Sequence, residues 1–82
     1  MYTVYALFSP QHNKIYIGQT KDLEERLRLH KEKVFGGYTS RYPGNWILIY
    51  QELVTNRIEA LRREKQLKSF RGREFIRKHI PT

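Results

Sequence analysis

Between Lys14 and His30 the chain carries a phenol, a glycine, a guanidinium and an imidazole at spacings that suit phosphate chemistry. Tyr16 lies in a run of β-branched and aromatic residues that favours a strand, and Gly18 then marks a break or a close approach of a ligand to the backbone. A helix is expected next, with Arg26 one turn inside it and His30 four residues later. A helix N-terminus beside a guanidinium is suited to holding a phosphate.

Two residues can serve as the N-cap of that helix. Asp22, with Glu25 three positions later, forms a capping box, and Thr20 is the alternative. The helix is expected from about residue 22 to residue 33, and its narrow apolar stripe reaches Val34. His30 falls inside that stripe, so it is either a core residue or part of a site.

The composition indicates one small basic domain over residues 1–82. The chain has no cysteine, which excludes disulfides and thiolate metal sites and fits a reducing cytoplasm. No signal peptide or membrane-length apolar run is evident, so we expect a cytoplasmic protein without a membrane association. The net charge is +8, and residues 57–82 carry nine Lys or Arg against three Glu, a difference of +6. This distribution favours a polyanionic partner, most simply nucleic acid.

Three strands and three helices are expected along the chain. The strands cover residues 2–8, 15–17 and 46–54, and the helices cover about 22–33, 57–69 and 71–80, the last with Phe75 and Ile76 as anchors. The first two strands form an antiparallel hairpin. A two-residue loop would pair Tyr5 with Tyr16, a four-residue loop would also keep them on one face, and an odd loop would separate them. We expect the two phenols on the same face.

Residues 35–45 contain three glycines and a proline and are expected to form a loop. Its Tyr38, Arg41 and Tyr42 can stack on bases or contact phosphates. They can equally pack over the core as a lid. Both interpretations stay open.

Glu64 is expected on the apolar half of the helix over residues 57–69, the half that holds Ile58 and Leu61. A carboxylate there costs free energy unless it has a partner. Lys68 or Arg57 can provide a plain ion pair, and spacing alone does not exclude that role.

Together these residues resemble the GIY-YIG nuclease superfamily, which includes the N-terminal domain of the UvrC repair nuclease. The motifs that carry the resemblance are Thr3-Val4-Tyr5, Tyr16-Ile17-Gly18, Arg26 and Glu64. The similarity covers about residues 2–70 and is strongest to small stand-alone bacterial members.

The resemblance implies an α+β fold with a three-stranded antiparallel sheet flanked by helices. It implies that Glu64 binds one divalent metal, Mg²⁺ or Mn²⁺, and that Arg26 contacts the scissile phosphate. Tyr5 and Tyr16 would flank the attacking water, with Tyr5 as base or positioning group, and His30 matches a His of some members. A free phenol has a pKa near 10, so Arg26 or the metal would have to lower it.

Three departures from the family pattern accompany the resemblance. The first motif is Thr-Val-Tyr instead of Gly-Ile-Tyr, and only its Tyr carries chemistry. No Asn follows Phe70, where many catalytic members have one. No appended DNA-binding domain is evident, so recognition has to come from the basic segment, from residues 38–42 or from a partner.

The implied function is a metal-dependent endonuclease acting on DNA, structure-specific and linked to repair or recombination. The alternatives are a non-catalytic nucleic-acid-binding module with the same fold, and an accessory protein whose basic tail docks on an acidic partner. DNA is favoured over RNA as the nucleic acid. A protein partner is also allowed, and the chain is expected to be a monomer or a weak dimer. The expected nucleic-acid contacts, mostly a solvated basic face, are Lys21, Arg41, Arg62, Arg63, Lys68, Arg71 and Arg73.

Overall fold

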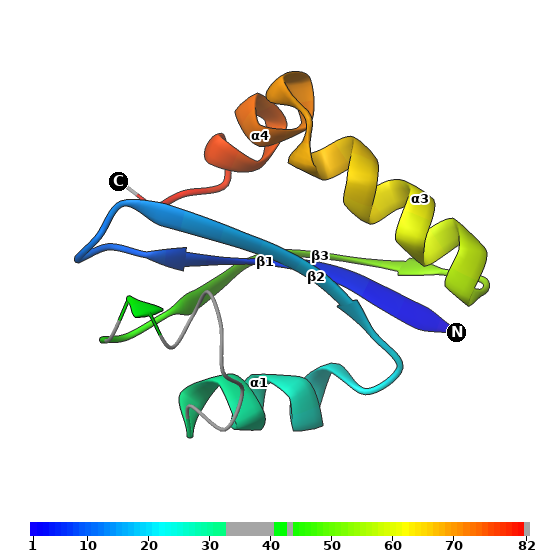
Figure 1. Ribbon diagram of the computed structural model, residues 1–82, viewed down its shortest axis with the longest axis horizontal. Helices are drawn as coiled ribbons and strands as arrows, with labels where there is room; N and C mark the ends of the chain where they lie inside the picture. The colour runs from blue at the N-terminus through cyan, green and yellow to red at the C-terminus, as the bar shows by residue number, and fades with distance from the viewer. Residues whose placement is uncertain (33–40, 43, 82) are drawn as a thin grey trace.

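A computed structural model of the chain places a three-stranded sheet between one helix on one face and two helices on the other (Figure 1). The structure describes residues 1–32, 41–42 and 44–81. The elements are β1 (Tyr2–Ser9), β2 (Lys14–Thr20), α1 (Leu23–Lys31), β3 (Ile47–Val54), α3 (Arg57–Lys68) and α4 (Phe70–Arg77). The strand order is β2-β1-β3 and both pairs are antiparallel, which confirms the expected α+β fold. Within the described ranges, no helix is long and apolar enough to cross a bilayer.

The register of the β1–β2 hairpin decides which side chains share a face. Ser9 pairs with Lys14 across a four-residue turn, so Tyr5 lies opposite Gly18. Since alternate residues of a strand point to the same face, Tyr5 and Tyr16 are on one face. This confirms the expected placement of the two phenols, and it excludes the two-residue loop that would have paired them directly.

Strand β2 and helix α1 differ from expectation at their ends. β2 continues to Thr20, so of the two roles expected for Gly18 a break in the strand is excluded. Asp22 is the N-cap of α1, and its Oδ1 accepts a hydrogen bond of 3.1 Å from the backbone N–H of Glu25. Thr20 is therefore not the cap; its Oγ1 accepts from the backbone N–H of Asp22 at 3.2 Å. α1 ends at Lys31, and Val34 lies outside the described residues.

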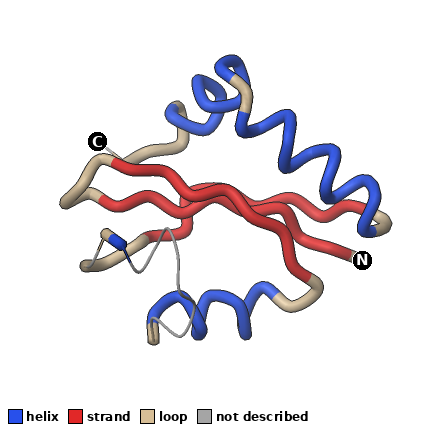
Figure 2. Tube along the Cα trace, in the orientation of Figure 1, coloured by secondary structure: helices blue, strands red, loops and turns tan. Residues whose placement is uncertain are grey.

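Figure 2 shows two helices on the face of the sheet opposite α1. The core lies between these helices, α3 and α4, and the sheet. Its buried members come from β1, β2, α3 and α4, and they are Val4, Ala6, Ile17, Ala60, Leu67 and Ile76. Ile58 and Leu61 are 68% and 45% exposed, so the broad apolar face expected for α3 is wrong. The buried residues of α3 are Ala60 and Leu67, which define a narrow apolar strip against the sheet.

The corner between α3 and α4 is fixed by one serine and one glycine. Ser69 Oγ donates to the carbonyl of Gln66 at 2.6 Å and accepts from the backbone N–H of Gly72 at 3.2 Å, so it ends α3 and caps α4. A Cβ on Gly72 would lie 2.2 Å from the Gln66 carbonyl oxygen. α4 runs over 70–77 instead of 71–80, and of its expected anchors Ile76 is buried whereas Phe75 is partly exposed.

We expect Gly72→Ala to destabilise the protein by about 1–3 kcal/mol, because its methyl group has no room against the end of α3. Chemical denaturation measures the free energy of unfolding. Arg71→Ala, at the exposed neighbouring position of α4, serves as the control and should change it by less than about 0.5 kcal/mol. Equal stability of the two variants would contradict the close contact at the corner.

Candidate active site

Tyr5 and His30 form the centre of the candidate site. Tyr5 is fully buried on β1, and its hydroxyl oxygen lies 2.9 Å from Nε2 of His30, the one buried residue of α1. The ring of Tyr16 lies 6.1 Å from the ring of Tyr5 and 5.0 Å from that of His30, between centroids. Three rings from β1, β2 and α1 therefore form one cluster on the α1 face of the sheet.

Gly18 provides the space in which this cluster forms. A Cβ at Gly18 would lie 2.8 Å from the Tyr5 hydroxyl and 2.9 Å from Cε1 of Tyr16. The Tyr5 ring therefore extends over Gly18 toward β2, at the edge of the sheet. The sequence analysis assigned Gly18 to a break or a ligand approach and missed this role. A four-residue turn between Ser9 and Lys14 already implies the pairing of residues 5 and 18.

The charges of Arg26 and Glu64, which lie on two different helices, both affect the pKa of Tyr5. Arg26 lies one turn before His30 on α1 and is half-buried, and the Glu64 side chain, on α3, is 21% exposed. Their charges both reach Tyr5, where Arg26 lowers the pKa of the phenol and Glu64 raises it. Tyr5, Tyr16 and His30 are thus in contact, whereas Arg26 and Glu64 influence Tyr5 through their charges, from helices on opposite faces of the sheet.

Glu64 also forms an ion pair with Lys68, with 2.7 Å between the carboxylate oxygen and Nζ. This is the i,i+4 contact that the plain ion-pair interpretation predicted. Glu64 lies between the buried Ala60 and Leu67 along α3, so its carboxylate is partly removed from water. The ion pair offsets part of that cost.

Burial is the main cause of the pKa shifts of Tyr5 and His30. The pKa of Tyr5 is raised well above its ordinary value, first by burial and next by Tyr16, and the opposing effect of Arg26 is smaller. The expectation of a lowered phenol pKa is therefore wrong for the free protein. The pKa of His30 is lowered, first by burial and then by Arg26. At neutral pH the imidazole is uncharged and can accept a proton from the Tyr5 hydroxyl.

The donor set near Tyr5 fits a weakly held Mg²⁺ or Mn²⁺. Among the described residues, no three His, Asp or Glu side chains gather as a metal cage. Mg²⁺ is commonly bound through one or two carboxylates, with waters and substrate phosphates completing its coordination. Glu64, a half-buried carboxylate whose charge reaches Tyr5, is consistent with that mode of binding.

The seven predicted nucleic-acid contacts occupy different environments. Lys21, Arg41, Arg71 and Arg73 are exposed, and Arg62 is exposed in a 2.9 Å pair with Glu59. Arg63 departs from the expected solvated face: its Nε lies 2.9 Å from Glu52, which also accepts from the Tyr50 hydroxyl. Hydrogen bonding to Glu52, and next to Tyr50, raises the pKa of Arg63, so its charge is neutralised within the fold.

Part of the loop over residues 35–45 is described. The ring of Tyr42 lies 5.5 Å from the ring of His12 and 5.3 Å from the ammonium of Lys14, and its carbonyl accepts from Trp46 Nε1 at 3.0 Å. Tyr42 therefore packs against the β1–β2 turn, which is not the lid over the core that one of the two interpretations proposed. Arg41 is exposed, and Tyr38 lies outside the described residues.

Comparisons with known proteins identify the family and the fold of this chain. The family model described as the GIY-YIG catalytic domain matches residues 1–76. A UPF0213 protein of Staphylococcus haemolyticus is 33% identical over 66 residues, which cover 79% of this chain and 78% of the relative. One of Staphylococcus saprophyticus is 39% identical over 57 residues, covering 68% and 67%. The solution NMR structure of a UPF0213 protein from Bacillus halodurans superposes with a TM-score of 0.55 at 27% identity, over 95% of this chain and 84% of that one.

We expect Gly18→Ala to separate the Tyr5 hydroxyl from His30, because the added methyl group occupies the space of the phenol. The ring resonances of His30 should shift in NMR spectra, and stability should fall by about 1–3 kcal/mol. A variant with unshifted His30 resonances would contradict the assigned role of Gly18.

Arg26→Gln should raise the pKa of His30, since it removes the nearby positive charge that disfavours the imidazolium. The pKa should stay below that of a free histidine because burial, the larger cause, remains. An NMR titration of the His30 ring measures the change. Arg28→Gln on the outward face of α1, where Arg28 pairs with Glu25 and Glu32, should leave the pKa of His30 unaltered.

Proposed function

This chain belongs to the GIY-YIG family of nuclease domains, and on that premise we propose that it is a metal-dependent endonuclease that hydrolyses phosphodiester bonds of DNA. The observation that carries the proposal is the hydroxyl of Tyr5, which contacts His30 and lies within the electrostatic reach of both Arg26 and Glu64. Branched or partly single-stranded DNA in repair or recombination is the proposed substrate. The active form is proposed to be one domain over residues 1–82, cytoplasmic, and a monomer or weak dimer.

Tyr5 and His30 are proposed to move the proton of the attacking water as a pair. The raised pKa of Tyr5 disfavours a free phenolate, whereas the neutral imidazole 2.9 Å away can accept the phenolic proton. As the water oxygen bonds to phosphorus, its proton passes to the Tyr5 oxygen and the Tyr5 proton passes to Nε2 of His30. The bond from phosphorus to the leaving oxygen breaks, solvent protonates that oxygen, and His30 returns its proton to solvent.

Arg26 and Tyr16 are proposed to hold the phosphate and the water in line with this pair. A guanidinium stays charged and matches phosphate oxygens in geometry, so Arg26 can stabilise the charge that develops in the transition state. Tyr16 packs against His30 and limits where the water can lie. Glu64 would hold the divalent cation, which when bound supplies Lewis-acid stabilisation of the phosphoryl oxygens.

A non-catalytic nucleic-acid-binding module is the second candidate. The ion pair of Glu64 with Lys68 favours it, because Lys68 occupies the carboxylate that would hold a cation. The raised pKa of Tyr5 also favours it, because it disfavours a phenolate as the base. The net charge of +8 serves either function equally.

Cleavage assays with Glu64→Gln test the proposed function. Labelled single-stranded, duplex and branched DNA are incubated with Mg²⁺ or Mn²⁺, and the variant should lose at least about a hundredfold in rate, as should Tyr5→Phe. Glu59→Gln is the matched control: Glu59 is also on α3 and also pairs with a basic residue, Arg62, and its variant should cleave normally. Binding of DNA by the unaltered protein without cleavage under any condition would favour the non-catalytic module.

A further inference from the structure

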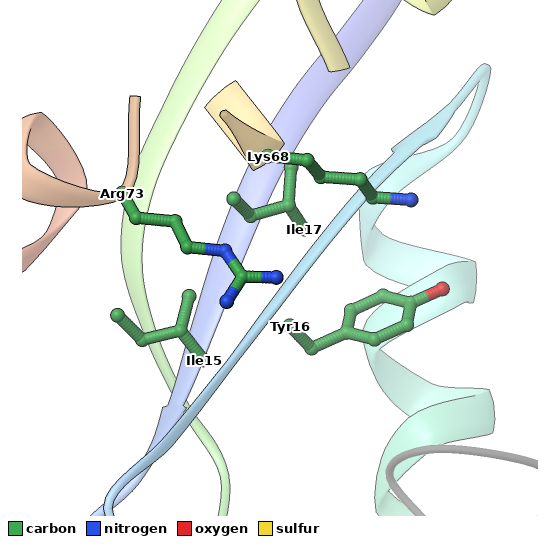
Figure 3. A pocket seen from close by; sticks show the side chains of 5 residues that line it. All are labelled: Ile15, Tyr16, Ile17, Lys68 and Arg73. Carbon is green, nitrogen blue, oxygen red and sulfur yellow. The ribbon is translucent and has the colours of Figure 1, made fainter. Parts of the chain in front are cut away.

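A pocket of about 300 Å³ lies at the outer edge of β2, where α3 ends and α4 begins (Figure 3). Ile15, Tyr16 and Ile17 of β2 line one side, and Lys68 of α3 and Arg73 of α4 line the other. Figure 3 shows the guanidinium of Arg73 directed toward the strand between Ile15 and Tyr16. The Lys68 chain extends past Ile17 in the same direction as the Tyr16 ring. Apolar side chains and an aromatic ring thus lie beside two cations.

This combination selects a ligand that is flat and apolar on one side and anionic on the other. Proteins that bind single-stranded nucleic acids pair a positive groove with apolar or aromatic surfaces that cover exposed bases. In a duplex the faces of each base are covered by its neighbours, so only an unpaired base can lie against Ile15 and Ile17. Arg73 is exposed and, among the described residues, has no carboxylate partner, so its charge is available to a phosphate.

We propose that this pocket binds one unpaired nucleotide of the substrate, with its base against Ile15 and Ile17 and its phosphate on Arg73. The inference rests on the proposed function and specifies its substrate: DNA in which a single-stranded segment adjoins the cleaved bond. The position follows from Tyr16, which lines the pocket and also lies in the ring cluster with Tyr5 and His30. A nucleotide held in the pocket is therefore next to the reacting group.

Lys68 connects the pocket with Glu64. Its ammonium pairs with the Glu64 carboxylate at 2.7 Å, and its side chain is half-exposed in the pocket wall. A phosphate in the pocket competes with Glu64 for Lys68. Occupation of the pocket therefore makes the carboxylate more available for a cation when the substrate strand is present.

Arg73→Ala and Arg77→Ala form a matched pair for the test. Both residues are exposed on α4 and both substitutions remove one positive charge, but only Arg73 lines the pocket. Affinities for a labelled dT 12-mer and for a 12-base-pair hairpin duplex are measured by fluorescence anisotropy in EDTA, so that no cleavage is needed. Arg73→Ala should bind dT about fivefold or more weakly, and the slope of log affinity against log salt should become about 0.7 shallower. The affinity of Arg73→Ala for the duplex should change less than about twofold. Arg77→Ala should likewise change less than about twofold in its affinity for either DNA.

Ile15→Thr tests the apolar side without removing a charge. It keeps a β-branched residue in the strand and should weaken dT binding about threefold, with duplex binding unchanged. Thermal unfolding checks that each variant is folded. Equal losses for Arg73→Ala and Arg77→Ala, or equal losses on single-stranded and duplex DNA, would overturn the proposal. Because binding is measured without metal, its result does not depend on whether the protein cleaves DNA. Failure of the proposed function and failure of this proposal can therefore be distinguished.

Discussion

The contact between the Tyr5 hydroxyl and His30 depends on the absence of a side chain at Gly18. The ring of Tyr5 occupies the space above that glycine, and this brings a phenol from the central strand toward the edge of the sheet. His30 meets it there because Asp22 fixes where α1 begins. The turn length, the helix start and one glycine together set the geometry of the candidate site.

One face of the sheet carries the ring cluster and the other carries the apolar core, and the charge of Glu64 acts across the two. α1 covers the ring cluster, whereas α3 and α4 cover the apolar core (Figure 1). Glu64 lies on the core side, between Ala60 and Leu67, yet its charge affects Tyr5 on the other side. This is possible because β2 is an edge strand, so groups from both faces can approach around it. The nucleotide pocket lies at the same edge.

The arrangement of the elements was predictable from the sequence because it depends on local signals. A capping box at Asp22 marked the start of α1, and alternation placed the two phenols on one face. The grouping of Glu64 with Tyr5 came from the family resemblance, since helical spacing alone also allowed an ion pair with Lys68. The ion pair is present in the structure, and the charge of Glu64 also raises the pKa of Tyr5.

What escaped prediction depends on tertiary packing. The raised pKa of Tyr5 follows from complete burial, which no spacing reveals. Arg63 belonged to a basic run, but Glu52 lies across from it only after β3 and α3 have packed. The exposure of Ile58 reflects the narrow contact of α3 with the sheet.

The alternation along β1 means that a change of its register would disturb the apolar core and the candidate site together. Val4 and Ala6 enter the apolar core, while Tyr5, between them, carries the hydroxyl of the candidate site. Slippage of β1 by a single position would turn the phenol into the core and expose aliphatic residues to α1. An insertion of one residue in the hairpin turn would disturb the same alternation on β2. The connection at residues 10–13 is therefore constrained in length, although it lies far from the reacting group.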